Sequence, residues 1–544
     1  MKKALFIDKP LLVYPTNDHG KPVWITLWEN EEILFQFYAF LNFREPKVWY
    51  YCDMTRWMGK SITLEVEMDD MTQEEFDTLV CADSFPGYAD IYDDPKRPQL
   101  QFTFKRGVLN DPNALFYVDG VYHMFVQHQP YTNEYGDWQE LCNFGWGHAI
   151  SKDLLHWTEL PDEFIPDEFG PAFSGNGVID ANNVSGLQQG DIPPILIYYT
   201  AAGGKGRRTM HLKHTQCMAY SVDGGKSFQK YAGNPIVPNF YPGNRDPKVL
   251  YHEESGKWLM VIFEDYDANK YLVLTSDDLF HFELVSEIEF GERECPNLFE
   301  LEVEGENRKQ LMFSGVRGLY MAVSFDGKDI KPLSPRKSIS AAGIYQAMQL
   351  MELPDGRKLS FYCTPVLGDG FNKCVGIPNE IKLFHEQDEY ILHMWPMREF
   401  DGLCVQRDVY SEITFPKSQE GMRIPAYELM DIDLHAEVTE ALMLNIHGVE
   451  VLVDARQGVL EVKAGEQQVA SVTLNKMGKC HLRLISDHQM LCVYEEYNHI
   501  VMPLQVKQCY SEDLLIQGAS VTVNSMEIRK LKSIWEKPSH EGVE

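Results

Sequence analysis

The sequence predicts an all-β protein. Stretches of alternating apolar and polar residues, rich in β-branched and aromatic types, recur along nearly all of its 544 residues. Clear examples are Ser61–Glu67 (SITLEVE), Ile195–Thr200 (ILIYYT) and Val521–Ile528 (VTVNSMEI). Long segments with a helical period are nearly absent. The chain is too long for one ordinary domain, and its 44% hydrophobic residues suffice for several packed cores.

In the first part of the chain, strand-like alternation predicts a small N-terminal β module over residues 1–85. A Pro- and Asp-rich composition then predicts a linker over 86–99. One short helix is expected around Met71–Val80, because Thr72 and Glu75 have the spacing of a capping box. The aromatic residues of this module either pack onto the rest of the protein or bind polysaccharide: Trp49, Tyr50, Tyr51 and Trp57.

Residues 100–395 carry an internal repeat. A Ser-x-Asp turn, usually followed by an aromatic residue, returns at intervals of roughly 50 to 70 residues and begins at Ser151, Ser221, Ser276 and Ser324. Such a recurring turn in β-rich sequence is typical of a propeller, in which each four-stranded blade reuses one hairpin. At about 60 residues a blade, the segment predicts five blades around a central channel. The alternative is that Ser-x-Asp is simply a common turn.

Three acidic residues lie one or two positions before a proline: Asp111, Asp246 and Glu294. Asp246 and Glu294 precede their repeat turns by the same 30 residues (276 − 246 and 324 − 294). Equivalent positions in successive blades face one axis, so the three carboxylates are expected to converge at the channel mouth. Close acids repel one another, and at least one should have a raised pKa. Such a group suits a retaining glycosidase, although a single Asp-Pro is more simply a turn.

Five segments around these acids resemble glycoside hydrolase family 32, the group of invertases, inulinases and levanases. They occur in the family's order: Leu109–Pro130 (LNDPNALFYVDGVYHMFVQHQP), Trp146–Pro161 (WGHAISKDLLHWTELP), Phe173–Asp180 (FSGNGVID), Asn244–Val249 (NRDPKV) and Glu294–Leu301 (ECPNLFEL). The resemblance implies a five-bladed β-propeller followed by a C-terminal β-sandwich, in agreement with the repeat. It also implies cleavage of β-fructofuranosides.

The resemblance assigns roles to the three acids. Asp111 would be the nucleophile that forms a fructosyl-enzyme, Glu294 the general acid/base, and Asp246 the residue that stabilises the transition state through fructose hydroxyls. Trp146 is either a sugar-stacking platform or a core aromatic, and Cys295 is expected to tune Glu294 rather than to attack. The residues implied to contact substrate are Asn110, Gln127, Tyr135, Trp146, Phe173, Ser174, Arg245 and Cys295.

Residues 396–544 show short alternating runs without a concentrated cluster of Asn, Asp, Trp and His, which predicts a β-sandwich whose role is packing. The net charge of −32 argues against a nucleic-acid or anionic-membrane partner, because phosphate binding relies on Lys and Arg. We find no signal-peptide core, no membrane-spanning run and no CxxC pair among 11 cysteines, which together predict a cytoplasmic protein. No metal or organic cofactor is expected, since the sequence has no HExxH motif, nucleotide-binding Gly loop or Cys/His ligand spacing.

The most direct interpretation is a retaining β-fructofuranosidase that removes terminal β-D-fructofuranosyl residues from sucrose, fructo-oligosaccharides, levan or inulin. Two alternatives stay open: a fructosyltransferase that makes fructans or a difructose anhydride through the same intermediate, and a non-catalytic fructan-binding protein. The sequence leaves open the linkage preference, the preferred chain length, exo or endo action, and the oligomeric state, with a homodimer as one option.

Overall fold

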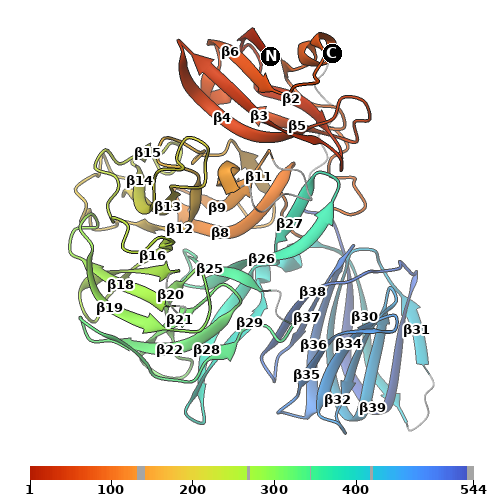
Figure 1. Cartoon of the computed structure of the whole chain (residues 1–544). Helices are drawn as coiled ribbons and strands as arrows, with labels where there is room; N and C mark the ends of the chain where they lie inside the picture. Colours follow the sequence, from red (N-terminus) through yellow and green to blue (C-terminus); the bar gives the residue numbers. More distant parts are fainter. Residues whose placement is uncertain (132–140, 266–269, 343–344, 417–420, 536–544) are drawn as a thin grey trace.

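The computed structural model describes residues 1–131, 141–265, 270–342, 345–416 and 421–535, and it confirms the all-β class (Figure 1). The short helix α1 (Gln73–Asp77) lies where the capping box predicts it, with reciprocal hydrogen bonds between Thr72 and Glu75. Short 3₁₀ helices are η1 (Thr55–Trp57), η2 (Leu141–Asn143) and η3 (Arg398–Leu403). Within the described ranges, no helix has the length and apolar character needed to cross a membrane. The cytoplasmic location stays a prediction.

The N-terminal strands form two small sheets that share one core. One sheet has the order β1 (Lys2–Phe6), β6 (Ser61–Glu67), β3 (Lys21–Glu29), β4 (Glu32–Leu41), and the other β5 (Val48–Asp53), β2 (Leu11–Thr16), β7 (Val80–Ala82). Alternate side chains of both sheets enter this core, as the period of a strand requires. Tyr50 and Trp57 are buried in it, and Tyr131, from beyond the linker, packs its ring 4.4 Å from Phe37. Tyr50 and Trp57 therefore pack inside the core of the N-terminal module.

The middle of the chain forms five four-stranded antiparallel blades. Their strands, blade by blade, are β8 (Gly107–Val118), β9 (Val121–Gln129), β10 (Gly145–Ser151), β11 (Trp157–Leu160); β12 (Ala172–Ile179), β13 (Ile195–Ala202), β14 (His214–Ser221), β15 (Gln229–Lys230); β16 (Arg245–His252), β17 (Lys257–Glu264), β18 (Lys270–Ser276), β19 (Glu283–Glu289); β20 (Asn297–Glu302), β21 (Lys309–Ser314), β22 (Leu319–Phe325), β23 (Ile330–Pro332); and β25 (Gln346–Glu352), β26 (Lys358–Gly368), β28 (Asn379–Glu386), β29 (Glu389–Pro396). The short strand β24 (Lys337–Ser338) pairs with β22. First strands of neighbouring blades contact one another around the ring, from β8 through β12, β16, β20 and β25 back to β8. These five strands therefore line the axis of the propeller.

The repeated Ser-x-Asp turn joins the third and fourth strands of a blade. After β10, Ser151 Oγ accepts a hydrogen bond from the Leu154 N–H at 2.9 Å. After β18, Ser276 Oγ accepts the same bond from the Leu279 N–H, also at 2.9 Å. Short polar side chains that satisfy the backbone of a turn explain why this sequence returns once in each of these blades.

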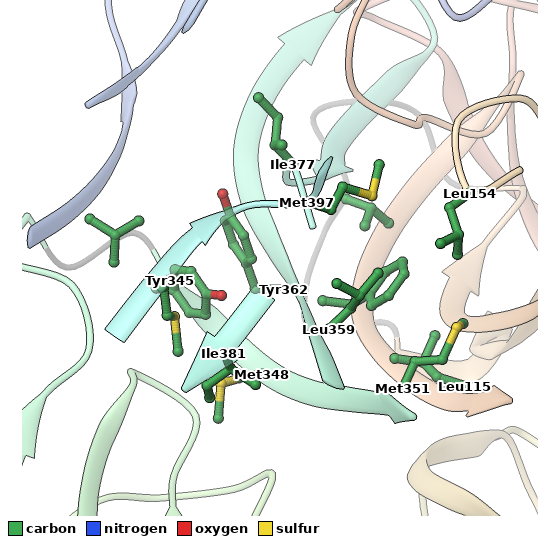
Figure 2. Close-up of a cluster of buried hydrophobic side chains, with 14 of the residues drawn as sticks. Leu115, Leu154, Tyr345, Met348, Met351, Leu359, Tyr362, Ile377, Ile381 and Met397 are labelled. Atoms are coloured by element: carbon green, nitrogen blue, oxygen red, sulfur yellow. The ribbon is translucent and has the colours of Figure 1, made fainter. Parts of the chain in front are cut away.

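One short strand closes the ring. Strand β27 (Phe371–Val375) pairs with β26 and, in parallel, with the start of β8, where Phe371 faces Gly107. The first and fifth blades thus become one nine-stranded sheet. An apolar cluster lies along this seam, and Figure 2 shows Leu115 of the first blade beside Met351 of the fifth. Burial of this cluster stabilises the closed ring.

The C-terminal strands form the β-sandwich: β30 (Cys404–Phe415), β31 (Gly421–Pro425), β32 (Met430–Ile446), β33 (Val449–Asp454), β34 (Val459–Ala464), β35 (Gln467–Thr473), β36 (Gly478–Asp487), β37 (Met490–Glu495), β38 (Ile500–Gln505) and β39 (Asp513–Leu531). The long strands β32 and β39 pair with each other, while β32 pairs with β36 along its first half and with β33 along its second. Tyr494 and Leu531 join Met394 of the fifth blade in one apolar cluster, so the sandwich packs on the propeller. The domain boundaries (1–85, 86–99, 100–395 and 396–544) stay predictions, because strand limits alone do not define folding units.

Candidate active site

A cavity of about 940 Å³ lies at one end of the propeller axis. Residues of the first, fourth and fifth blades and of β27 line it, including Asp111, Glu294, Arg317, Gln346 and Lys373. Most of these side chains are polar or charged, which suits a ligand with many hydroxyl groups better than an apolar one.

Asp111 lies on β8, at a point where the pairing of β8 with β9 is irregular. Its Oδ2 accepts hydrogen bonds from Ser174 Oγ at 2.8 Å and from Cys295 Sγ at 3.1 Å. Burial raises the pKa of the Asp111 carboxyl above its ordinary value, while the charge of Lys373 and these two hydrogen bonds act in the opposite direction. The donors hold one carboxylate oxygen in a fixed direction.

Asp246 is the most buried of the three acids, with 5% of its surface exposed. Its φ of 63° lies in the left-handed region, and the pairing of β16 with β17 shifts register beside it. Its backbone N–H donates to Thr200 Oγ1 at 2.8 Å, and its Oδ2 accepts from the Cys295 N–H at 3.0 Å. Burial, together with the charges of Glu294 and Asp111, raises the Asp246 pKa to about 7, although Arg245 opposes this rise.

Glu294 and Cys295 lie just before β20, and both have positive φ angles, 59° and 39°. This turn leaves the Glu294 side chain 46% exposed and directs Cys295 towards the other two acids. Burial raises the pKa of the Cys295 thiol well above its ordinary value, so the thiol acts as a donor and not as a nucleophile. The hydrogen bonds of Cys295 reach Asp111 and Asp246, and the expected tuning of Glu294 by Cys295 stays a prediction.

Arg245 connects the acids from the side of the third blade. Its Nη2 donates to Glu294 Oε1 at 2.7 Å, its Nη1 donates to Asp265 Oδ2 at 2.9 Å, and its Nε lies 3.8 Å from Asp246 Oδ2. The guanidinium also lies over the ring of Phe263, 4.8 Å from its centroid. The surrounding carboxylates raise the Arg245 pKa against the effect of burial. The cation therefore lowers the repulsion within the acidic group.

Asn110, Gln127 and Lys373 form a polar chain beside Asp111. Asn110 Nδ2 donates to Gln127 Oε1 at 2.8 Å, and Lys373 Nζ donates to Asn110 Oδ1. The motifs predict Asn110 and Gln127, but sequence reasoning missed Lys373. No local signal marks this lysine, because it reaches the site only through the parallel pairing of β27 with β8.

The remaining predicted substrate contacts have different outcomes. Phe173 and Ser174 lie on β12, and both are buried. Trp146 is fully buried, donates its indole N–H to the Phe173 carbonyl at 3.0 Å, and packs against Phe164. The prediction that Trp146 stacks on a sugar is therefore wrong, since no face of the ring is open to a ligand. Tyr135 lies outside the described residues.

Comparison with known proteins assigns the family. The model of the glycosyl hydrolases family 32 N-terminal domain matches residues 101–396, more than half of the chain. The chain belongs to glycoside hydrolase family 32. It is a glycoside hydrolase. Its β-propeller and its C-terminal β-sandwich are the architecture seen in the structures of this family.

Relatives of this family 32 hydrolase include the levanase of Bacillus subtilis, 29% identical over 82% of this chain and 72% of the levanase. The extracellular exo-inulinase InuE of Aspergillus niger is 36% identical over 44% of this chain and 48% of its own length. Among solved structures, the exo-inulinase of Aspergillus awamori aligns with a TM-score of 0.70 and 22% identity, over 82% of this chain and 100% of the inulinase. This structural likeness supports the fold.

Proposed function

We propose that this protein is a retaining β-fructofuranosidase that releases terminal fructose from sucrose, fructo-oligosaccharides, levan or inulin. The observation that carries the proposal is the joining of three acids from three blades: Cys295 bonds to Asp111 and Asp246, and Arg245 links Asp246 with Glu294. A levanase, exo-inulinases and an invertase are among the relatives, which supports a fructoside as the substrate.

In the proposed reaction, Asp111 attacks the anomeric carbon of the fructosyl residue. The hydrogen bonds from Ser174 and Cys295 occupy Oδ2, which leaves Oδ1 for the attack. Glu294, partly exposed at the cavity, protonates the leaving oxygen and then activates water against the fructosyl-enzyme. This reuse of one residue as acid and then as base gives net retention.

Asp246 and the chain of Asn110, Gln127 and Lys373 bind the fructose hydroxyls in this proposal. A carboxylate that accepts hydrogen bonds from hydroxyls stabilises positive charge on the ring as the oxocarbenium-like transition state forms. Asp246 is ionised when it does so, and Arg245 beside it favours that form.

The test is incubation of the full chain with sucrose, inulin and levan in parallel, with products separated by size over time. Early free fructose is expected, whereas early oligosaccharides or an anhydride would identify a transferase, and tight binding without products a silent binding protein. Asp111→Asn should lower kcat by about 10⁴-fold or more and Glu294→Gln by about 10²- to 10⁴-fold. Asp119→Asn, on the exposed β8–β9 turn, is the matched control. Fructose release by Asp111→Asn at the wild-type rate would overturn the proposal.

A further inference from the structure

A cluster of two histidines and an aspartate lies in the sandwich, far along the chain from the catalytic acids. His435 on β32 pairs in register with His481 on β36, and Asp433 lies two positions before His435 on the same face of β32. One ligand atom from each of the three residues lies within 4.8 Å of the other two. Among the described residues, these three form the one group of His, Cys, Asp or Glu side chains in which three possible ligand atoms lie this close together.

We propose that Asp433, His435 and His481 bind a divalent transition-metal ion, with Zn²⁺ as the best fit. Asp433 Oδ1 lies 2.8 Å from His481 Nε2 and 3.7 Å from His435 Nε2. Ligand atoms at tetrahedral corners around Zn²⁺ are separated by about 3.4 Å, given bonds of about 2.0–2.1 Å. The two observed distances bracket this value, and the third pair of ligand atoms lies within 4.8 Å. The rings of His435 and His481 are stacked with centroids 3.7 Å apart, so side-chain rotation is needed to aim both nitrogens at one ion.

The atoms of the cluster that face away from the ion are already held. His481 Nδ1 lies 2.6 Å from Glu496 Oε2, which directs its Nε2 towards Asp433. Asp433 Oδ2 accepts from Arg529 Nη2 at 3.3 Å, which leaves Oδ1 for the ion. A carboxylate behind a ligating histidine is the usual outer partner in zinc sites, because it fixes the tautomer and the ring direction. The positive charge of Arg529 is itself paired with other carboxylates, Asp431 and Glu527.

The cluster is open on one side and anchored on the other. The His435 side chain is 45% exposed, whereas that of His481 is 11% exposed, so an ion can enter from solvent and find a fixed partner. A water molecule would complete four ligands. The His481 ring also lies 4.8 Å from Trp395 of β29, the last strand of the propeller. The ion would therefore stiffen the contact between the fifth blade and the sandwich, a role separate from glycoside hydrolysis.

The test uses the full chain in a Cys509→Ser background, which removes the exposed thiol as a competing ligand. After chelation and dialysis, zinc sulfate is titrated by calorimetry, and the melting temperature is followed with zinc concentration. We expect about one Zn²⁺ per chain and a melting temperature that rises with the logarithm of free zinc. His435→Gln and His481→Gln should each weaken binding about tenfold or more, since each removes one ligand.

His281→Gln is the matched control, because His281 is an exposed histidine beside a single carboxylate, that of Asp278. His435→Gln is the decisive variant: it leaves the bonds of His481 to Asp433 and Glu496 in place, and an unchanged melting temperature without metal verifies its fold. No zinc binding, or binding as tight in His435→Gln and His481→Gln as in the unsubstituted ligand set, would overturn the proposal. The cluster would then be a hydrogen-bonded network around His481.

Discussion

Arg245 and Glu294 form a direct ion pair across two blades, with Nη2 2.7 Å from Oε1. Only 12% of the Arg245 side chain is exposed, and its Nε lies 3.8 Å from Asp246. One partly buried cation is thus shared by two of the acids to which we assign catalytic roles, and the charges of all three residues are coupled.

Replacement of Arg245 by Gln should lower kcat/KM for sucrose by about 10²-fold or more, because the site loses a preorganised charged donor. The Asp246 pKa should rise further, since Arg245 lowers it in the native protein. The measurement is kcat/KM as a function of pH. Arg423→Gln, at an exposed arginine of the sandwich, is the control. Equal pH profiles for wild type and Arg245→Gln would contradict the shared-cation relationship.

Asp246→Asn should remove activity and yet stabilise the fold above pH 7. The native pKa is about 7 and the unfolded value about 3.9, so the native state binds more protons between these pH values. Stability therefore falls as pH rises from about 4 to about 7 and stays lower above that range. The variant lacks this loss, and its melting temperature should exceed that of wild type at pH 8 but not at pH 4. A difference that is the same at both pH values would count against the raised pKa.

Lys373→Met should impair catalysis through Asn110 and Asp111 rather than through the fold. The Asp111 pKa should rise because the charge of Lys373 lowers it, which moves the acidic limb of kcat/KM to higher pH. KM for sucrose should also rise, as Asn110 loses its partner. Lys373→Arg should restore most of the pH profile, and Lys382→Met, at an exposed position of β28, is the control. An unshifted acidic limb would argue against this charge effect.

Trp146→Phe should destabilise the protein and leave substrate affinity nearly unchanged. The variant loses the hydrogen bond to the Phe173 carbonyl and leaves a small cavity, at a cost of about 1–3 kcal/mol. Thermal melting measures the first effect and KM for sucrose the second. The opposite pattern, a raised KM at an unchanged melting temperature, would indicate that Trp146 contacts the sugar.

Much of the fold follows from local sequence. Alternation with period two marks strands, and the capping box of Thr72 and Glu75 marks α1, because both signals depend on neighbours in the chain. The Ser-x-Asp turn repeats because the first four of the five blades use the same kind of hairpin between their third and fourth strands. The three acids stand out for the same reason, since a repeated structure places equivalent residues near one axis.

Other features depend on contacts between distant segments, and only the tertiary structure decides them. Lys373 enters the site because β27 pairs with β8 across the ring closure, and Trp146 is buried by Phe164 and its neighbours. The sequence predicts only packing for the sandwich, yet strand pairing brings His481 beside His435. The sequence by itself determined the strands, the repeat and the acids. Burial, the pKa of Asp246 and the partners of each charge were decided by the folded chain, because they depend on long-range desolvation and Coulomb interactions.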